Sequence, residues 1–175
     1  GYYVGDEVNP QYHDQIKSTA TTLQNLDPWH PRLFVANINA GVNELPQTVQ
    51  PFLDVCNIMA GDFYPYGYAT SAGIAQFGAT CQQFQSDCTR AAVQSGFVLQ
   101  AFSFTSYGQV TCQPWPQCAA FPTHDQMKQQ HDIALANATP EVILCYSYFD
   151  ILRSSTDPNV VAQNWANVVA AANSN

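Results

Sequence analysis

Short apolar runs alternate with amphipathic segments along the whole chain. Five apolar runs are predicted as β-strands, at residues 1–7, 33–38, 57–63, 97–104 and 142–150. The segments between them repeat apolar residues at helical spacing, and they predict helices at residues 9–26, 45–56, 73–95, 123–137 and from 157 onward. Strands and helices in regular alternation indicate an α/β fold with a parallel sheet and helices packed outside it.

Helix start signals support this division. Asn9 precedes Pro10, Asp157 precedes Pro158, and Thr123 and Gln126 have the spacing of a capping box. Residues 73–95 allow either one continuous helix or a break near residues 81–86, with Gly96 as the stop. The last helix is expected to bury an inner stripe, made of Val161, Trp165, Val168 and Val169.

The 175 residues are expected to form a single domain of five consecutive βα units. This arrangement predicts part of a (β/α) TIM-type barrel, with an open doubly wound, flavodoxin-like sheet as the alternative. Five strands cannot close an eight-stranded barrel without leaving bare edges. We therefore expect a fragment or half of a longer barrel, a homodimer mate covering the edges, or rearrangement into an open sheet. Because Gly1 follows no methionine or signal peptide, we expect a processed product.

The composition excludes several classes of partner. The net charge is −8, and only five Lys and Arg residues are scattered along the chain. Binding to nucleic acid or to an anionic membrane needs a basic patch that these residues cannot build. No apolar run approaches the ~18 residues that span a bilayer. The acidic, aromatic-rich chain suits neutral, hydroxyl-rich ligands better.

The six cysteines form an even set without zinc-site spacing, and six cysteines allow about 15 pairings. Cys112 and Cys118 lie in one long loop and could close it. Cys81 and Cys88 could pair only if the chain between them is not continuous helix, and a link from that segment to the loop is the competing option. Cys145 is as well explained by a buried free thiol as by a bridge. With the sequon at Asn137, this pattern favours a secreted, disulfide-bonded glycoprotein.

Polar and aromatic residues gather where the predicted strands end. In a parallel sheet these ends meet at one edge, which is where ligands bind. The residues placed there are Asp6, Glu7, Asn37, Asn39, Asp62, Tyr64, Tyr66, residues 100–104 and residues 146–150. Several carboxyl groups at one edge favour acid–base chemistry on a sugar, where two carboxyls about 5–10 Å apart flank the scissile bond.

Simpler roles compete with this interpretation. Glu7 could cap the following helix, Asp62 could bond to backbone amides inside the barrel, and the aromatic rings could be ordinary packing. The four histidines lie in predicted helices or turns, away from the strand ends, so we expect no metal site and no cofactor.

Three segments resemble a known family. Residues 1–7 (GYYVGDE), 62–67 (DFYPYG) and 146–150 (YSYFD) are similar to strands four, six and eight of glycoside-hydrolase-type TIM barrels. The resemblance implies that Glu7 occupies the acid/base position at the end of strand four. It also implies a nucleophilic Glu at the end of strand seven, but residues 97–107 contain no acid, and Gln100 is the nearest polar residue. Strands one to three have no counterpart here.

The sequence thus predicts a glycoside-hydrolase-like protein acting on or binding a neutral polysaccharide or oligosaccharide. Glu7 is the expected acid/base, and Asp62, or else Asp150, the second carboxylate. Further ligand contacts are expected from Asp6, Asn37, Tyr64, Tyr66, Gln100, Trp115, Tyr146 and Tyr148. The alternative is a non-catalytic carbohydrate-binding protein that has lost the nucleophile. A flavodoxin-like nucleotide site is disfavoured, because Asp6 and Glu7 stand where a glycine-rich phosphate loop would follow the first strand.

Overall fold

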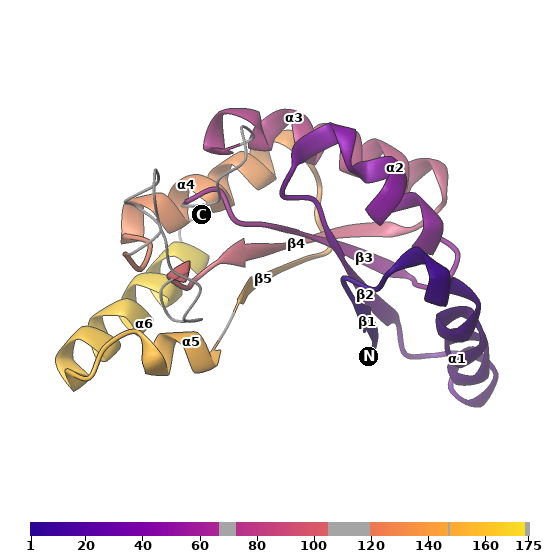
Figure 1. The fold of residues 1–175 in the computed structure, drawn as a ribbon, viewed down its shortest axis with the longest axis horizontal. Coiled ribbons are helices and arrows are strands. Elements are labelled where there is room, and N and C mark those ends of the chain that lie inside the picture. The colour runs from indigo at the N-terminus through magenta and orange to yellow at the C-terminus, as the bar shows by residue number, and fades with distance from the viewer. Residues whose placement is uncertain (67–72, 105–119, 147, 174–175) are drawn as a thin grey trace.

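The computed structural model describes residues 1–66, 73–104, 120–146 and 148–173, except the side chains of residues 148 and 149. Five parallel strands form one sheet that curls into a half-barrel (Figure 1). They are β1 (Tyr2–Asp6), β2 (Arg32–Asn37), β3 (Ile58–Phe63), β4 (Gln94–Gln100) and β5 (Val142–Tyr146). Each strand pairs with its neighbours in sequence, in the order β1-β2-β3-β4-β5. The predicted partial barrel is confirmed, and the doubly wound alternative is excluded because its strand order is not sequential.

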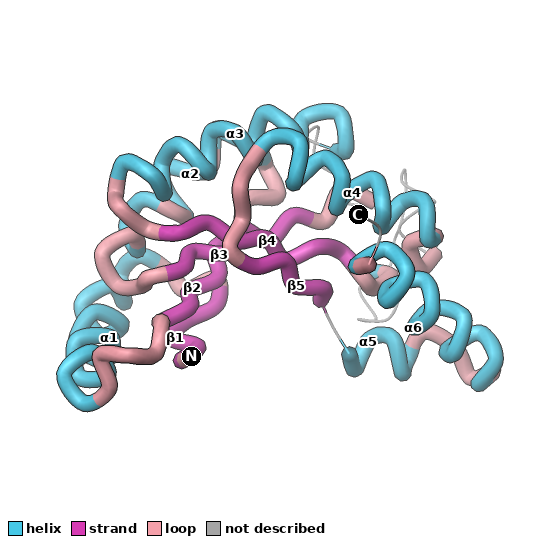
Figure 2. Tube along the Cα trace, turned by 180° about the vertical axis from the view of Figure 1, so that it is seen from behind, coloured by secondary structure: helices cyan, strands magenta, loops and turns pink. Residues whose placement is uncertain are grey.

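The helices lie along the outer side of the curved sheet (Figures 1 and 2). They are α1 (His13–Leu26), α2 (Leu45–Thr48), α3 (Gly73–Arg90), α4 (His124–Asn137), α5 (Tyr148–Arg153) and α6 (Pro158–Ala172). Three short 3-10 turns accompany them, at η1 (Pro10–Tyr12), η2 (Gly41–Asn43) and η3 (Gln50–Phe52). None of the helices in the described ranges is long and apolar enough to cross a membrane.

The main core lies between the sheet and these helices, and stacked aromatic rings fill much of it. Phe34 of β2 stacks on Phe52 with ring centroids 4.4 Å apart, and Phe63 of β3 stacks on Phe77 of α3 at 4.5 Å. All four rings are buried. Burying each side chain contributes about 1.5–3 kcal/mol, so these contacts hold the helices against the strands.

Alternate residues of the strands face the inside of the half-barrel. Val35, Ala60 and Val98 form a separate small cluster there, with Leu33 and Leu144 against it at partial burial. The period of two along a strand explains why Phe34 faces the helices while its neighbours Leu33 and Val35 face inward.

The predicted helix at 73–95 is wrong at its end. α3 runs without a break from Gly73 to Arg90, and β4 already begins at Gln94. The helix stops because Ala92 adopts a left-handed conformation with φ 57°. Val93 N–H then donates to Cys88 C=O at 2.9 Å and Ala92 N–H to Thr89 C=O at 3.1 Å. This is the Schellman motif, built here on an alanine in place of glycine.

We expect Ala92→Gly to raise the free energy of unfolding by about 0.5–1 kcal/mol, because glycine adopts a positive φ without the steric penalty of a Cβ atom. Urea denaturation measures this change. Ala79, exposed within α3, provides the control: Ala79→Gly is expected to lower stability by about 1 kcal/mol. A loss of stability in both variants would contradict the left-handed helix end.

Other boundaries also differ from the predictions. β4 ends at Gln100 and not at residue 104, and residues 45–56 form α2 and η3, not one helix. Pro51 accounts for the second difference, since it supplies no N–H for a continuing helix. The predicted strand 142–150 stops at Tyr146, after which residues 148–153 form α5, because Ile151 turns into a cluster beneath α6.

The start of α6 is confirmed, with Asp157 capping the N–H of Asn159 at 2.8 Å. Its inner stripe is only partly correct. Val168 is buried, but Trp165 is 46% and Val169 41% exposed, while Ala171 is buried instead. The buried side of α6 is the one that contacts Met127 of α4 and Ile151 of α5, so the stripe is rotated from the predicted one.

The disulfide prediction is wrong for the cysteines that the structure describes. Cys56, Cys81, Cys88 and Cys145 are free thiols. Cys81 and Cys88 belong to the same continuous helix, where seven residues rise about 10 Å, too far for a bridge. Cys112 and Cys118 lie outside the described residues. The secreted location and glycosylation stay predictions, and the Asn137 side chain bonds to Ile133 C=O and Gln82.

Candidate functional site

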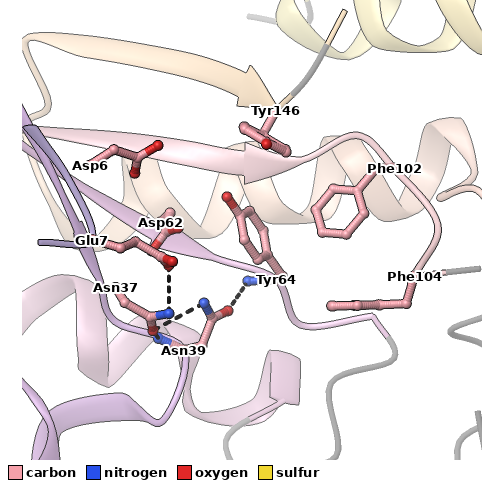
Figure 3. Close-up of a pocket in the computed structure, with 9 residues that line it drawn as sticks. All are labelled: Asp6, Glu7, Asn37, Asn39, Asp62, Tyr64, Phe102, Phe104 and Tyr146. Atoms are coloured by element: carbon pink, nitrogen blue, oxygen red, sulfur yellow. Dashed lines mark hydrogen bonds between the residues drawn. The ribbon is translucent and has the colours of Figure 1, made fainter. Parts of the chain in front are cut away.

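A pocket of about 240 Å³ opens at the carboxyl ends of the strands (Figure 3). Its lining combines three carboxyl groups, two amides and four aromatic rings. These residues are Asp6, Glu7, Asn37, Asn39, Asp62, Tyr64, Phe102, Phe104 and Tyr146. They come from the ends of all five strands or from the residues just after them. Acids far apart in the sequence therefore meet at one place.

Glu7 reaches the pocket through an unusual backbone. The β1–β2 register shifts between Tyr3 and Gly5, and Glu7 then takes a positive φ of 46°. Its N–H donates to Val35 C=O at 3.0 Å, which ties this turn to β2. A non-glycine residue at positive φ costs about 1–3 kcal/mol, and such strain is concentrated at functional sites. The turn directs the Glu7 side chain toward Asn37 and Asp62 (Figure 3).

Gly5 is required by the same turn. A Cβ atom at this position would lie 2.6 Å from the buried ring of Phe34. The close approach of β1 to that ring therefore excludes any larger residue directly before the two acids.

A chain of hydrogen bonds links the ends of β1, β2 and β3. Asn37 Nδ2 donates to Glu7 Oε1 at 2.6 Å. Asn37 Oδ1 accepts from the backbone N–H of Asn39 at 3.0 Å and from Asn39 Nδ2 at 3.2 Å. Asn39 Oδ1 in turn accepts from the backbone N–H of Tyr64 at 2.5 Å. The Glu7 carboxylate is thus held by an amide that is itself held by its neighbours.

Asp62 is the buried member of the acidic group, with only 2% of its surface exposed. Its Oδ1 atom accepts no hydrogen bond from any described residue. Burial first, and then the hydrogen bond and negative charge of Glu7, raise the pKa of Asp62 far above the ordinary range, while Tyr64 acts weakly in the opposite direction. A proton on Asp62 makes its contact with Glu7 attractive, whereas two ionised carboxylates would repel.

Asp6 lies on the more open side of the same pocket. Partial removal from water raises the pKa of Asp6, a hydrogen bond with Tyr3 lowers it, and the charge of Glu7 raises it again. The pocket lining contains no Lys or Arg. An anionic ligand would therefore meet uncompensated negative charge.

The opposite wall of the pocket is aromatic. Tyr64 meets Phe102 edge-on with ring centroids 4.9 Å apart, and Phe102 meets Phe104 at 4.9 Å and Tyr146 at 5.8 Å. Mutual edge contacts fix the orientation of the rings. Tyr146 is 38% exposed, so part of this wall is open to a ligand.

Some predicted site residues lie elsewhere. The Tyr66 hydroxyl donates to Gln126 C=O at 3.1 Å and contacts Gln129 Oε1 at 2.7 Å, outside the pocket lining. Gln100 is fully buried and bonds to the backbone of Tyr66 and Phe102. Asp150 is buried in α5 and does not line the pocket either.

Trp115 and the Tyr148 side chain lie outside the described residues. The structure brings together the other predicted residues, Glu7, Asp62, Asp6, Asn37, Tyr64 and Tyr146.

Three lining residues received no role from the sequence. Asn39 was placed at the strand ends, and its signal is the Asn-x-Asn spacing after a buried strand. Phe102 and Phe104 continue the two-residue alternation that begins at Gln100. Within the described part of the chain, no group of three or more His, Cys, Asp or Glu side chains is arranged to hold a metal ion.

Comparison of the chain with protein-family models found no match, and a search of curated protein sequences found none either. The functional interpretation therefore depends on the geometry of the pocket.

Proposed function

We propose that this pocket binds a neutral oligosaccharide and that the protein is glycoside-hydrolase-like, with Glu7 acting on the glycosidic bond. The observation that carries the proposal is one pocket in which a contacting pair of carboxyl groups, Glu7 and Asp62, faces an aromatic wall. Carboxyl and amide oxygens accept hydrogen bonds from sugar hydroxyls, and the aromatic rings offer apolar faces to sugar rings. The absence of cationic residues from the pocket lining favours an uncharged ligand.

The two carboxyl groups have different roles in this proposal. Glu7 is exposed and reaches the ligand, so it exchanges a proton with the glycosidic oxygen. Asp62 is buried and contacts Glu7 directly, which differs from two carboxyls standing on opposite sides of a scissile bond. We therefore assign Asp62 the role of sharing its proton with Glu7.

A second candidate is non-catalytic carbohydrate binding. It is favoured by the end of β4, where the resembled family carries a nucleophilic Glu. This chain has Gln100 there, buried and fully engaged in internal hydrogen bonds. Binding without release of shorter sugars would support this candidate.

A binding experiment with matched variants tests the proposal. Wild-type protein is titrated with neutral gluco-, manno- and xylo-oligosaccharides, and binding is followed by calorimetry and NMR while product formation is measured. We expect Tyr146→Ala to weaken binding about tenfold, since one aromatic contact contributes about 0.5–1.5 kcal/mol.

Trp29→Ala is the control. It removes a ring that is 90% exposed and does not line the pocket, so binding should not change. Failure of every neutral oligosaccharide to bind, or equal losses in both variants, would contradict the proposal.

A further inference from the structure

The hydrogen-bond chain at the pocket has a fixed direction, and the direction starts at a backbone group. The N–H of Tyr64 can only donate, and it meets Asn39 Oδ1 at 2.5 Å. The oxygen of the Asn39 amide must therefore face Tyr64, which leaves its NH₂ group on the other side. That NH₂ group lies 3.2 Å from Asn37 Oδ1.

The same direction passes on to Glu7. Asn37 Oδ1 accepts both from the Asn39 side chain and from the Asn39 backbone N–H at 3.0 Å. The Asn37 NH₂ group must then point to the opposite side, where Glu7 Oε1 lies at 2.6 Å. A rotation of either amide by 180° would place oxygen against oxygen in at least one of these contacts.

Water cannot easily replace Asn39 in this arrangement. The residue is only 4% exposed, so a lost bond would leave a buried polar group unpaired. Its position after β2 places it between Asn37 and the end of β3, where it connects the two strand ends (Figure 3).

We propose that Asn39 is a positioning residue, which through Asn37 keeps an N–H donor directed at Glu7 and so makes Glu7 the ionised member of the Glu7–Asp62 pair. This inference rests on the proposed function only in assigning a use to the pair. An N–H donor stabilises a carboxylate, whereas a carbonyl oxygen in its place would require a proton on Glu7. The proton shared by the two acids is therefore retained by Asp62, whose Oδ1 accepts no bond from the described residues.

The other groups that face Glu7 do not impose this order by themselves. Asp6 from β1, Asp62 from β3 and the hydroxyls of Tyr64 and Tyr146 lie around the same pocket. Asp6 and Asp62 are acidic, and the lining holds no cation. Among the lining residues, the Asn37 amide is the group whose hydrogen bond to Glu7 is well formed.

The test is Asn39→Asp, which keeps the shape of the side chain but replaces its NH₂ group by an oxygen. Asn37 is then expected to rotate and donate to the carboxylate introduced by the substitution, so that its own oxygen faces Glu7. Carbon-13 NMR of the carboxyl groups reports which acid carries the shared proton. At neutral pH we expect the Glu7 signal to move upfield and the Asp62 signal downfield, the reverse of the wild-type order.

Asn43→Asp is the charge-matched control, because Asn43 is exposed in the nearby turn η2 and takes no part in the chain of hydrogen bonds. It should leave both carboxyl signals as in the wild type. If Asn39→Asp and Asn43→Asp give the same spectra, Asn39 does not position Glu7.

A measurement on the wild-type protein covers the case in which Asn39→Asp does not fold. Scalar couplings across hydrogen bonds are expected from the Tyr64 amide nitrogen to Asn39 Cγ and from Asn37 Nδ2 to Glu7 Cδ. Their absence would overturn the proposed direction. Neither experiment needs a sugar, so failure of the carbohydrate proposal is distinguished from failure of this one.

Discussion

Substitution of Glu7 by glutamine is expected to lower the rate of glycosidic bond hydrolysis by about 10²–10⁴-fold, the usual contribution of general acid–base catalysis. Glutamine cannot transfer a proton, but its amide oxygen can still accept from Asn37, and its NH₂ group can donate to Asp62. The pocket should therefore keep its shape. Product release from a bound oligosaccharide measures the rate, and calorimetry measures binding, which we expect to change little.

Glu141→Gln is the matched control for this variant. Glu141 is exposed, lies just before the start of β5 and accepts a hydrogen bond from Gln94 at 3.0 Å. The change in charge is the same, yet hydrolysis should be unaffected. Retained hydrolysis in Glu7→Gln would remove Glu7 from the catalytic role, and equal binding without any hydrolysis by the wild type would favour the non-catalytic alternative.

Asp62→Asn is expected to stabilise the protein at neutral pH by about 2 kcal/mol, and the gain should disappear near pH 4. The pKa of Asp62 is raised from 3.8 to about 9, mainly by burial and then by Glu7. Below about pH 4 the side chain is protonated in both the folded and the unfolded chain. Between these limits the unfolded chain ionises Asp62 while the folded protein keeps the proton, so the free energy of unfolding falls as pH rises. Asparagine carries no such penalty.

Thermal or urea denaturation across pH 4 to 8, flanking the window set by the shift from 3.8 to about 9, measures this difference. Asp132→Asn provides a control of opposite sign. The ion pair with Lys128 lowers the pKa of Asp132, so its contribution is present at neutral pH and is lost as the solution becomes acidic. A stability gain for Asp62→Asn that does not depend on pH would show that Asp62 is ionised in the folded protein.

The order and type of the strands followed from the sequence because parallel βα units leave strong local signals. Buried strands form continuous apolar runs, and caps such as Thr123 with Gln126 mark helix starts. Element ends were harder to predict where local rules were broken. Ala92 ends α3 in a conformation that usually belongs to glycine, so the nearest glycine, Gly96, was taken as the stop. Gly96 instead lies in β4, where a Cβ atom would meet Val142 at 2.7 Å.

The composition of the site was predictable further than its internal geometry. Strand ends in a parallel sheet meet at one edge, so Glu7, Asn37 and Asp62 had to be neighbours there. The contact between Glu7 and Asp62 depends on the positive φ of Glu7 and on the register that sets Asn37 beside Asp62. Neither leaves a signal in the sequence. The burial of Gln100 likewise follows from the approach of Tyr66 and Gln130, which come from segments about 30 residues away in either direction.

The sequential strand order has a consequence for how the chain folds. Every strand pairs only with the strands before and after it in the sequence, so each pairing closes a loop of one helical connection and no longer. Loop closure of this size carries a modest entropic cost, and each new unit adds to a surface that is already formed. The sheet can consequently grow unit by unit from the amino terminus, in the same direction in which a ribosome delivers the chain.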